Sequence, residues 1–292
     1  MPPPPVPPRT GQLELPFARV RTPDRNAGRG GRSFYLFDLD DNLVHVETRI
    51  FLFDRDTGAE LPLSTRRFSE VSALVGKPGP FARYVVRDDD ATGSFRRFRD
   101  KDTLEPGERQ PFVEDLMATL ARPDHLWKGP SWPFFEHAVF NGRPVALITA
   151  RGHHRAVIDE GMDLLCRAGH LHARPSWLGV YNVSSHTVRA ALGDGALKRS
   201  VPELKRLALV DAVERAMREH GASPNHRFGV SDDDAQNLAV MVAAFVELKR
   251  RYPDNAFFVI DASRHPVVKT EILRDSTRTS EVPASEQMSL FE

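Results

Sequence analysis

Length, composition and charge set the first limits on this chain. It has 292 residues with 40 Lys+Arg and 40 Asp+Glu, so its formal net charge is zero and gives no reason to expect bulk binding to nucleic acid or membranes. A hydrophobic content of 40% suits a globular protein with one large domain and a subdomain. The single cysteine excludes an intrachain disulfide, and no apolar run approaches the roughly 20 residues of a membrane span, so we expect a cytoplasmic protein.

The two ends differ in composition from the rest of the chain. Residues 1–32 are rich in proline and then in glycine, which predicts a disordered tail. Residues 266–292 are polar and rich in Ser, Thr and Glu, which predicts a second disordered tail. The globular part is therefore expected over residues 33–265.

Short apolar runs alternate with helical patterns across this globular part. The expected strands are 34–37, 145–149, 177–183, 228–231 and 256–260, and the expected helices are 111–121, 131–140, 154–168, 201–220 and 232–251. Strands that alternate with helices predict an α/β fold, a Rossmann-like parallel sheet of about five strands with helices on both faces.

Residues 45–110, called the cap below, interrupt this alternation and read as a small β-rich insertion. Apolar runs on both sides of a turn at 54–58 predict a hairpin, a short helix is expected at 68–74, and 81–87 with 94–98 predict a second hairpin. This second hairpin interleaves arginine with aromatic residues. That pattern fits a phosphorylated or nucleic-acid ligand, or simply a hairpin with one core face and one solvated face.

Carboxylates follow the first strand directly, with Asp38 and Asp40 two residues apart. Ligands of open α/β sheets bind outside the carboxyl ends of the strands, so both side chains can reach one crevice. Crowded carboxylates disfavour ionisation unless a cation accompanies them, and magnesium is a hard cation of the required kind. An acidic turn is the alternative interpretation.

Polar residues also follow two further predicted strands, and their order along the chain is informative. Thr149-Ala-Arg151 follows the second strand, Asp232 and Asp233 follow the fourth, and lysines lie between them. This order resembles the four motifs of the haloacid dehalogenase (HAD) superfamily of phosphatases and phosphotransferases, over about residues 33–262. The resemblance implies an HAD-like fold whose cap, inserted after strand one, covers the site and selects the substrate.

The resemblance also implies roles for individual residues. Asp38 would be the nucleophile that forms an aspartyl-phosphate, Asp40 the general acid and base, and Thr149 a donor to the phosphoryl group. Magnesium would be held by Asp38, Asp232, Asp233 and the backbone carbonyl of Asp40.

The motif lysine is either Lys205 or Lys198. We favour Lys205, because Ser200 and Glu203 predict a capping box that places this lysine near the start of a helix. Either lysine could instead be a solvated helix residue.

Three neighbouring residues complete the expected site. Arg151 could bind a substrate phosphate bidentately or cap the next helix at the surface. Asp41 and Asn42 stand where the family commonly has Gly and Thr. Asp and Asn tolerate left-handed backbone, so the turn stays possible, and Asn42 is expected to bind the substrate through a hydrogen bond. His153 and His154 are expected at the surface.

The sequence thus predicts a magnesium-dependent phosphomonoester hydrolase that acts on a small molecule or a nucleic-acid end. The alternatives are a phosphotransferase that passes the group to an alcohol, and a non-catalytic HAD scaffold that binds a protein partner.

The C-terminal residues Gln287-Met-Ser-Leu-Phe291 carry a separate signal. They resemble the short peptide by which bacterial replication and repair proteins bind the DNA sliding clamp. Apolar anchors in a polar tail are expected to bury against a partner, or else to fold back onto the protein itself.

Overall fold

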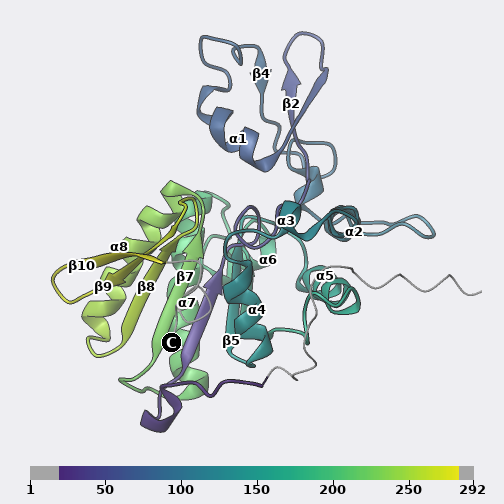
Figure 1. Cartoon of the computed structure of the whole chain (residues 1–292). Coiled ribbons are helices and arrows are strands. Elements are labelled where there is room, and N and C mark those ends of the chain that lie inside the picture. Colours follow the sequence, from purple (N-terminus) through teal and green to yellow (C-terminus); the bar gives the residue numbers. More distant parts are fainter. Residues whose placement is uncertain (1–19, 283–292) are drawn as a thin grey trace, which may run out of the picture.

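The computed structural model describes residues 20–282 and has an α/β core below a smaller cap (Figure 1). The core is built on a seven-stranded sheet of order β10-β9-β8-β7-β1-β5-β6. The five predicted parallel strands are present and are β1 Ser33–Phe37, β5 Pro144–Thr149, β6 Ser176–Asn182, β7 Arg227–Asp232 and β8 Ala256–Asp261. They run parallel to one another, with β1 between β7 and β5.

Strand β1 is the middle one of the five parallel strands, and its side chains are apolar on both faces. Phe34 and Leu36 pack into one hydrophobic cluster, and Tyr35 and Phe37 into the other. All five residues of the strand are buried, as expected for a strand covered on both sides. A continuous apolar run thus accounts for both the position and the parallel pairing of this strand.

Helices cover both faces of the sheet, as predicted. One face carries α2 Pro111–Leu120, α4 Trp132–Phe140 and α5 Arg155–Arg167, and the other carries α7 Val201–His220 and α8 Ala235–Arg251. The short elements η1 Ala27–Arg29, α3 Asp124–Trp127 and α6 His186–Ala191 complete the core. No helix within residues 20–282 combines the length and apolarity that crossing a bilayer requires.

The C-terminal boundary differs from the prediction. Residues expected in a disordered tail from 266 onward form β9 Val267–Ile272 and β10 Thr277–Val282, two antiparallel strands that extend the sheet beyond β8. Most of their side chains are polar and only partly buried or exposed, since β10 is the edge strand and β9 lies next to it, and this composition resembles that of a disordered segment.

The N-terminal boundary also differs. Within the predicted tail 1–32, residues 20–32 pack against the core. Asp24 accepts a hydrogen bond from the backbone N–H of Ser33, and Arg143 donates to the carbonyl of Thr22. Residues 1–19 lie outside the described part of the chain.

The cap forms a separate small sheet of order β3-β2-β4 that stands above the carboxyl end of the main sheet (Figure 1). The predicted first hairpin and short helix are present as β2 Ile50–Asp54, β3 Glu60–Leu63, α1 Thr65–Val71 and η2 Ser72–Leu74. The predicted second hairpin is wrong, because β4 Tyr84–Val85 pairs with β2 and the segment beyond it forms η3 Arg96–Phe98.

Candidate active site

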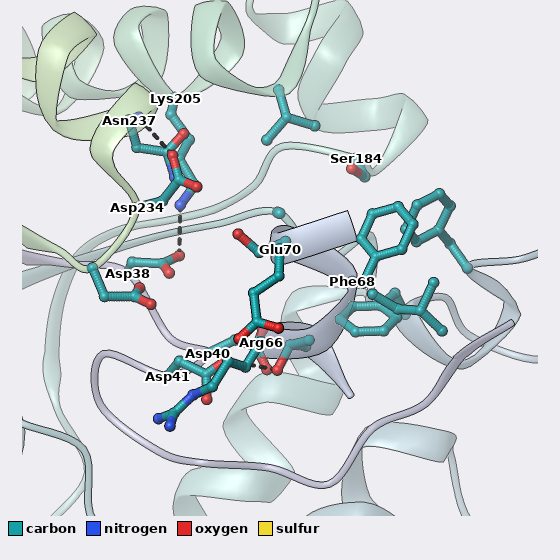
Figure 2. A pocket seen from close by; sticks show the side chains of 18 of the residues that line it. Asp38, Asp40, Asp41, Arg66, Phe68, Glu70, Ser184, Lys205, Asp234 and Asn237 are labelled. Carbon is teal, nitrogen blue, oxygen red and sulfur yellow. Dashed lines mark hydrogen bonds and ion pairs between the residues drawn. The ribbon is translucent and has the colours of Figure 1, made fainter. Parts of the chain in front are cut away.

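A cavity of about 510 Å³ lies between the cap and the carboxyl ends of the core strands (Figure 2). Its floor comes from the core and includes Asp38, Asp40 and Lys205, and its roof comes from the cap and includes Thr65 and Phe68. The prediction that polar strand ends converge beneath a cap therefore agrees with the structure. A volume of this size suits a small-molecule site.

Asp38 lies directly beyond β1, where parallel pairing with β7 fixes its backbone. Its N–H donates to the carbonyl of Ser231 at 3.0 Å, and its side chain is buried. Its Oδ1 lies 2.9 Å from the Nζ of Lys205. The predicted nucleophile is thus held by the sheet on one side and by a charged partner on the other.

Lys205 is the lysine that reaches the carboxylates, as the capping argument predicted. Ser200 and Glu203 form the expected capping box at the start of α7, and Lys205 lies in the next turn. Its Nζ also lies 2.8 Å from Oδ2 of Asp232. Lys198, by contrast, is exposed, and its backbone N–H donates to Asp194.

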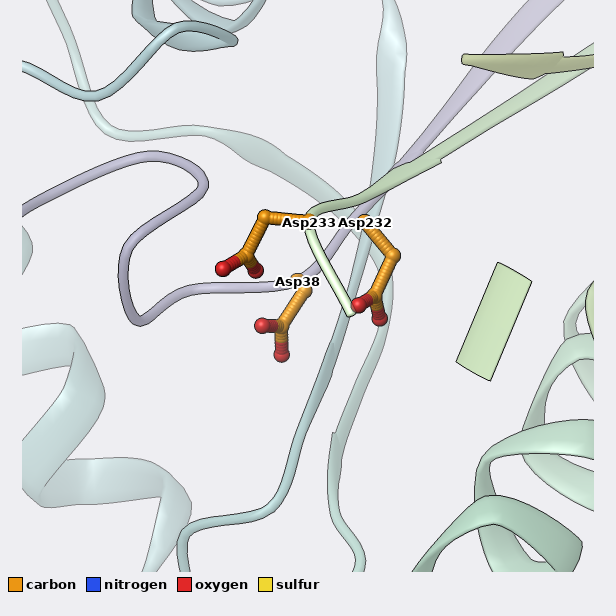
Figure 3. A group of neighbouring side chains, drawn as sticks. All are labelled: Asp38, Asp232 and Asp233. Carbon is orange, nitrogen blue, oxygen red and sulfur yellow. The ribbon is translucent and has the colours of Figure 1, made fainter. Parts of the chain in front are cut away.

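Asp38, Asp232 and Asp233 form an acidic cluster in which one carboxylate oxygen from each residue lies within 4.8 Å of the other two (Figure 3). Burial raises the pKa of Asp38 well above its ordinary value; the Lys205 ammonium opposes this shift, and the Asp232 and Asp233 carboxylates add to it. Burial, followed by the charge of Asp232, raises the pKa of Asp233 to about 7. The Lys205 ammonium contacts two of these three carboxylates, those of Asp38 and Asp232.

This donor set fits a divalent cation. Carboxylate oxygens are the ligands that Mg²⁺ prefers, and a second positive charge would relieve the repulsion that raises these pKa values. Although burial alone lowers the pKa of Lys205, the carboxylates of Asp232 and Asp38 raise it above its ordinary value, so Lys205 stays charged. Its one charge does not bring the pKa values of Asp38 and Asp233 back to their ordinary range. The side chain of Asp40, predicted to contribute through its backbone carbonyl, is outside this carboxylate cluster.

Asp232 is oriented by neighbours on the following turn. Its Oδ1 accepts from the N–H of Asp234 at 2.9 Å and from Nδ2 of Asn237 at 3.1 Å. Asp234 in turn caps α8 by accepting from the second and third N–H groups of that helix. The helix start therefore fixes the Asp232 carboxylate toward Lys205.

Arg151 takes a different role from the one predicted. Its side chain is fully buried, and its Nε and Nη2 donate to the two carboxylate oxygens of Asp40 at 2.9 and 2.7 Å. Nη2 also donates to Thr48 at 2.8 Å, and the guanidinium lies over the rings of Phe98 and Phe112. Its bidentate hydrogen bonds therefore hold Asp40, which lines the cavity, instead of a substrate phosphate, and Arg151 does not cap a surface helix.

Asn42 is also structural instead of substrate-binding. Its side chain is buried, and its Nδ2 donates to the carbonyl of Asp38 at 3.0 Å and to Oγ of Ser231 at 2.9 Å. Its Oδ1 accepts from the hydroxyl of Ser131 at 2.7 Å. Asn42 thus joins the loop after β1 to β7 and to the start of α4, and it does not line the cavity.

Asp41 confirms the turn that the sequence allowed. It has a left-handed backbone with φ of 57°, a conformation that Asp tolerates better than most residues. Its carboxylate accepts from Thr65 at 2.6 Å and lies 2.9 Å from Nδ1 of His45. The residue therefore connects the loop after β1 to the first turn of α1 in the cap.

Thr149 ends β5 as predicted, with a fully buried side chain. Its Oγ1 accepts from the N–H of Arg151 at 3.3 Å, and Ala150 instead of Thr149 lines the cavity. Its expected role as a donor to the phosphoryl group stays a prediction.

Several residues around the site were missed or misplaced by the sequence analysis. His153, expected at the surface, is fully buried with Nδ1 2.7 Å from Oδ1 of Asp100. The hydroxyl of Thr48 accepts a hydrogen bond from Arg151 and donates one to Asp115 at 2.8 Å. These contacts join segments that are far apart in sequence, so no local spacing of residues predicts them. Asn237 differs, because it lies about one helical turn after Asp232 and helix geometry could have predicted their contact.

Comparison with known proteins found no relative of this chain. No family model matches this chain, and neither the curated proteins nor the solved structures contain a match. The interpretation of the site therefore depends on its own geometry.

Proposed function

We propose that this protein is a magnesium-dependent phosphomonoester hydrolase of HAD type that acts through an aspartyl-phosphate at Asp38. The observation that carries the proposal is the contact of Asp38 with Lys205 at 2.9 Å, inside an acidic cluster at the floor of a cavity. A carboxylate nucleophile and a phosphate monoester repel each other, and attack needs positive charge beside both. Lys205 is placed to supply part of this charge.

The first half of the proposed reaction transfers the phosphoryl group to the enzyme. An Asp38 oxygen attacks phosphorus while the bond from phosphorus to the ester oxygen breaks, and Asp40 gives its proton to the departing oxygen. Lys205 donates to a phosphoryl oxygen. Magnesium, held by Asp38, Asp232 and Asp233, would neutralise the charge of the phosphoryl group when bound.

The second half returns the enzyme to its starting state. Asp40 takes a proton from water, the water oxygen attacks phosphorus, and the bond to Asp38 breaks to give inorganic phosphate. Arg151 keeps the Asp40 carboxylate in place, while each carboxylate oxygen retains a further lone-pair position for the proton. An alcohol in place of water would make the same site a phosphotransferase.

The test is release of phosphate from an aryl phosphate with and without Mg²⁺. Asp38→Asn is expected to lose activity by several powers of ten, since a missing nucleophile removes the covalent step. Asp261→Asn is the matched control, because Asp261 also ends a parallel strand but does not line the cavity. If Asp38→Asn kept a tenth or more of wild-type turnover, the covalent mechanism would be contradicted. Full activity in excess chelator would contradict the requirement for magnesium. If an added alcohol became phosphorylated and less inorganic phosphate was released, the enzyme would be a phosphotransferase.

The proposal includes a cytoplasmic enzyme recruited to replication or repair sites through Gln287–Phe291. This part depends on the resemblance to clamp-binding peptides, and the segment lies outside the described residues. Asp38, Asp40 and Lys205 line one cavity, and Asp232 pairs with Lys205, which supports an enzyme over a non-catalytic scaffold.

A further inference from the structure

The wall of the cavity opposite the carboxylates is aromatic. Phe68 of α1 and Phe95 and Phe98 near η3 line it, with ring centroids 5.4 Å apart for Phe68 and Phe95 and 6.3 Å apart for Phe95 and Phe98. Both pairs are edge-to-face, at 89° and 81°. Figure 2 shows Phe68 on the other side of the cavity from Asp38 and Lys205. If the phosphate of a ligand lies at Asp38, the rest of the ligand therefore extends toward these rings.

These rings keep surface available for a ligand. Phe68 and Phe95 are only partly buried, and both face the cavity of about 510 Å³. Phe98 is packed from behind by the guanidinium of Arg151, 4.7 Å from its ring centroid, so its position is fixed. Edge-to-face pairs hold the rings rigidly, and rigid aromatic surface that stays open to solvent is suited to stacking with another flat ring.

The lining of the cavity is more apolar than polar. Ile50, Ala150 and Val201 line it together with the three phenylalanines, and α1 contributes the polar residues Thr65, Arg66, Ser69 and Glu70. A sugar or polyol would lose the water around its hydroxyl groups where it contacts the rings, and each hydroxyl group left unpaired there would cost free energy. A flat aromatic ring carries no such penalty over its faces, and polar groups on its edge can still reach Ser184 or Asn237 at the cavity margin.

We infer that the natural substrate is a phosphomonoester whose leaving group carries a flat aromatic ring, such as a nucleobase. The inference rests on the proposed function, since it assumes that the phosphate lies at Asp38. Both a free nucleotide and the phosphorylated end of a nucleic acid contain a phosphomonoester and a nucleobase. Arg99 at the margin is already paired with Asp90 at 2.5 Å and donates to the carbonyl of Ser184 at 2.7 Å, so a long polyanion gains little there and the free nucleotide is favoured.

A substrate panel tests the inference with the full chain and Mg²⁺. We expect kcat/KM for 1-naphthyl phosphate and for nucleoside monophosphates to exceed that for glycerol phosphate and glucose 6-phosphate about tenfold or more. An oligonucleotide with a terminal phosphate separates the two sources of a nucleobase, and is expected to be the poorer substrate. Equal values across the panel, or a preference for the two substrates without a ring, would overturn the inference.

Variants of the aromatic wall give an independent readout. Phe95→Leu and Phe68→Leu are each expected to raise KM for 1-naphthyl phosphate about tenfold and to leave KM for glycerol phosphate within about twofold. Phe81→Leu is the matched control, because Phe81 belongs to the cap but does not line the cavity, and it should change neither value. The same loss for both substrates would indicate a folding defect of the cap and count against stacking.

Binding separates this inference from the proposed function. Titration calorimetry of Asp38→Asn with 1-naphthyl phosphate and with glycerol phosphate, in Mg²⁺, needs no turnover. Tighter binding of the aromatic compound, lost when Phe95→Leu is added, would support the inference even if no substrate were hydrolysed and the proposed reaction failed. Equal or absent binding of the two compounds would overturn the inference while leaving the proposed reaction open.

Discussion

Replacing Lys205 by methionine should destabilise the fold in a way that magnesium partly reverses. The Lys205 ammonium lies 2.9 Å from Asp38 and 2.8 Å from Asp232, and all three side chains are buried. At an effective dielectric constant of about 20, each contact contributes roughly 6 kcal/mol of Coulomb energy. Most of this offsets the desolvation of the charges, and removal of one partner from a buried ion pair typically costs about 3–5 kcal/mol net.

Urea unfolding of wild type and Lys205→Met, in chelator and in excess Mg²⁺, measures this cost. We expect a loss of about 3–5 kcal/mol in chelator. The loss should be smaller in Mg²⁺, because the cation replaces the missing positive charge in the native state only. Lys198→Met is the control and should change the free energy of unfolding by less than about 0.5 kcal/mol, since Lys198 is exposed. A loss below about 1 kcal/mol in chelator would refute the view that Lys205 balances the acidic cluster.

Three further predictions concern other parts of the chain. Arg151→Lys keeps the charge but loses the bidentate grip on Asp40, so kcat should fall about 10- to 100-fold with KM within about twofold; steady-state kinetics that show unchanged kcat would contradict this positioning role. Burial, then Arg227, lowers the pKa of Lys269 to about 8. The unfolded chain therefore holds the proton that the native state has lost between about pH 8 and 10.4, and the free energy of unfolding should rise with pH across that window. In urea unfolding at a series of pH values, Lys269→Met should show a smaller rise in the free energy of unfolding than wild type, and an equal rise in the variant would refute the role of Lys269. A labelled C-terminal peptide should bind purified bacterial sliding clamp in fluorescence anisotropy, and binding that survives Leu290→Ala with Phe291→Ala would exclude the motif.

Sequence and structure agree where one segment contains all the information. The five parallel strands are mostly apolar runs, and the burial of β1 on both faces could be predicted without knowledge of its partners. The convergence of Asp38 and Asp232 follows from that topology, because carboxyl ends of parallel strands meet at one edge. Lys205 could be chosen over Lys198 because the Ser200–Glu203 capping box is a local signal.

The predictions that failed depended on partners that are remote in sequence. The polar strands β9 and β10 resembled a disordered tail because their hydrogen-bond partners belong to β8 and to each other. The second hairpin of the cap failed because Tyr84–Val85 pairs with β2 instead of with the segment that follows it. Composition and alternation describe one strand at a time and do not name its neighbour.

The sequence by itself therefore determined the α/β core, the cap insertion and the carboxylates at the strand ends. Only the tertiary structure decided what the polar side chains beside them do. Arg151 and Asp40 are 111 residues apart, and Asn42 and Ser231 are 189 residues apart. Buried charges and amides must find hydrogen-bond partners, and which partners lie within 3 Å is set by the packing of the whole domain and not by the local pattern of residues.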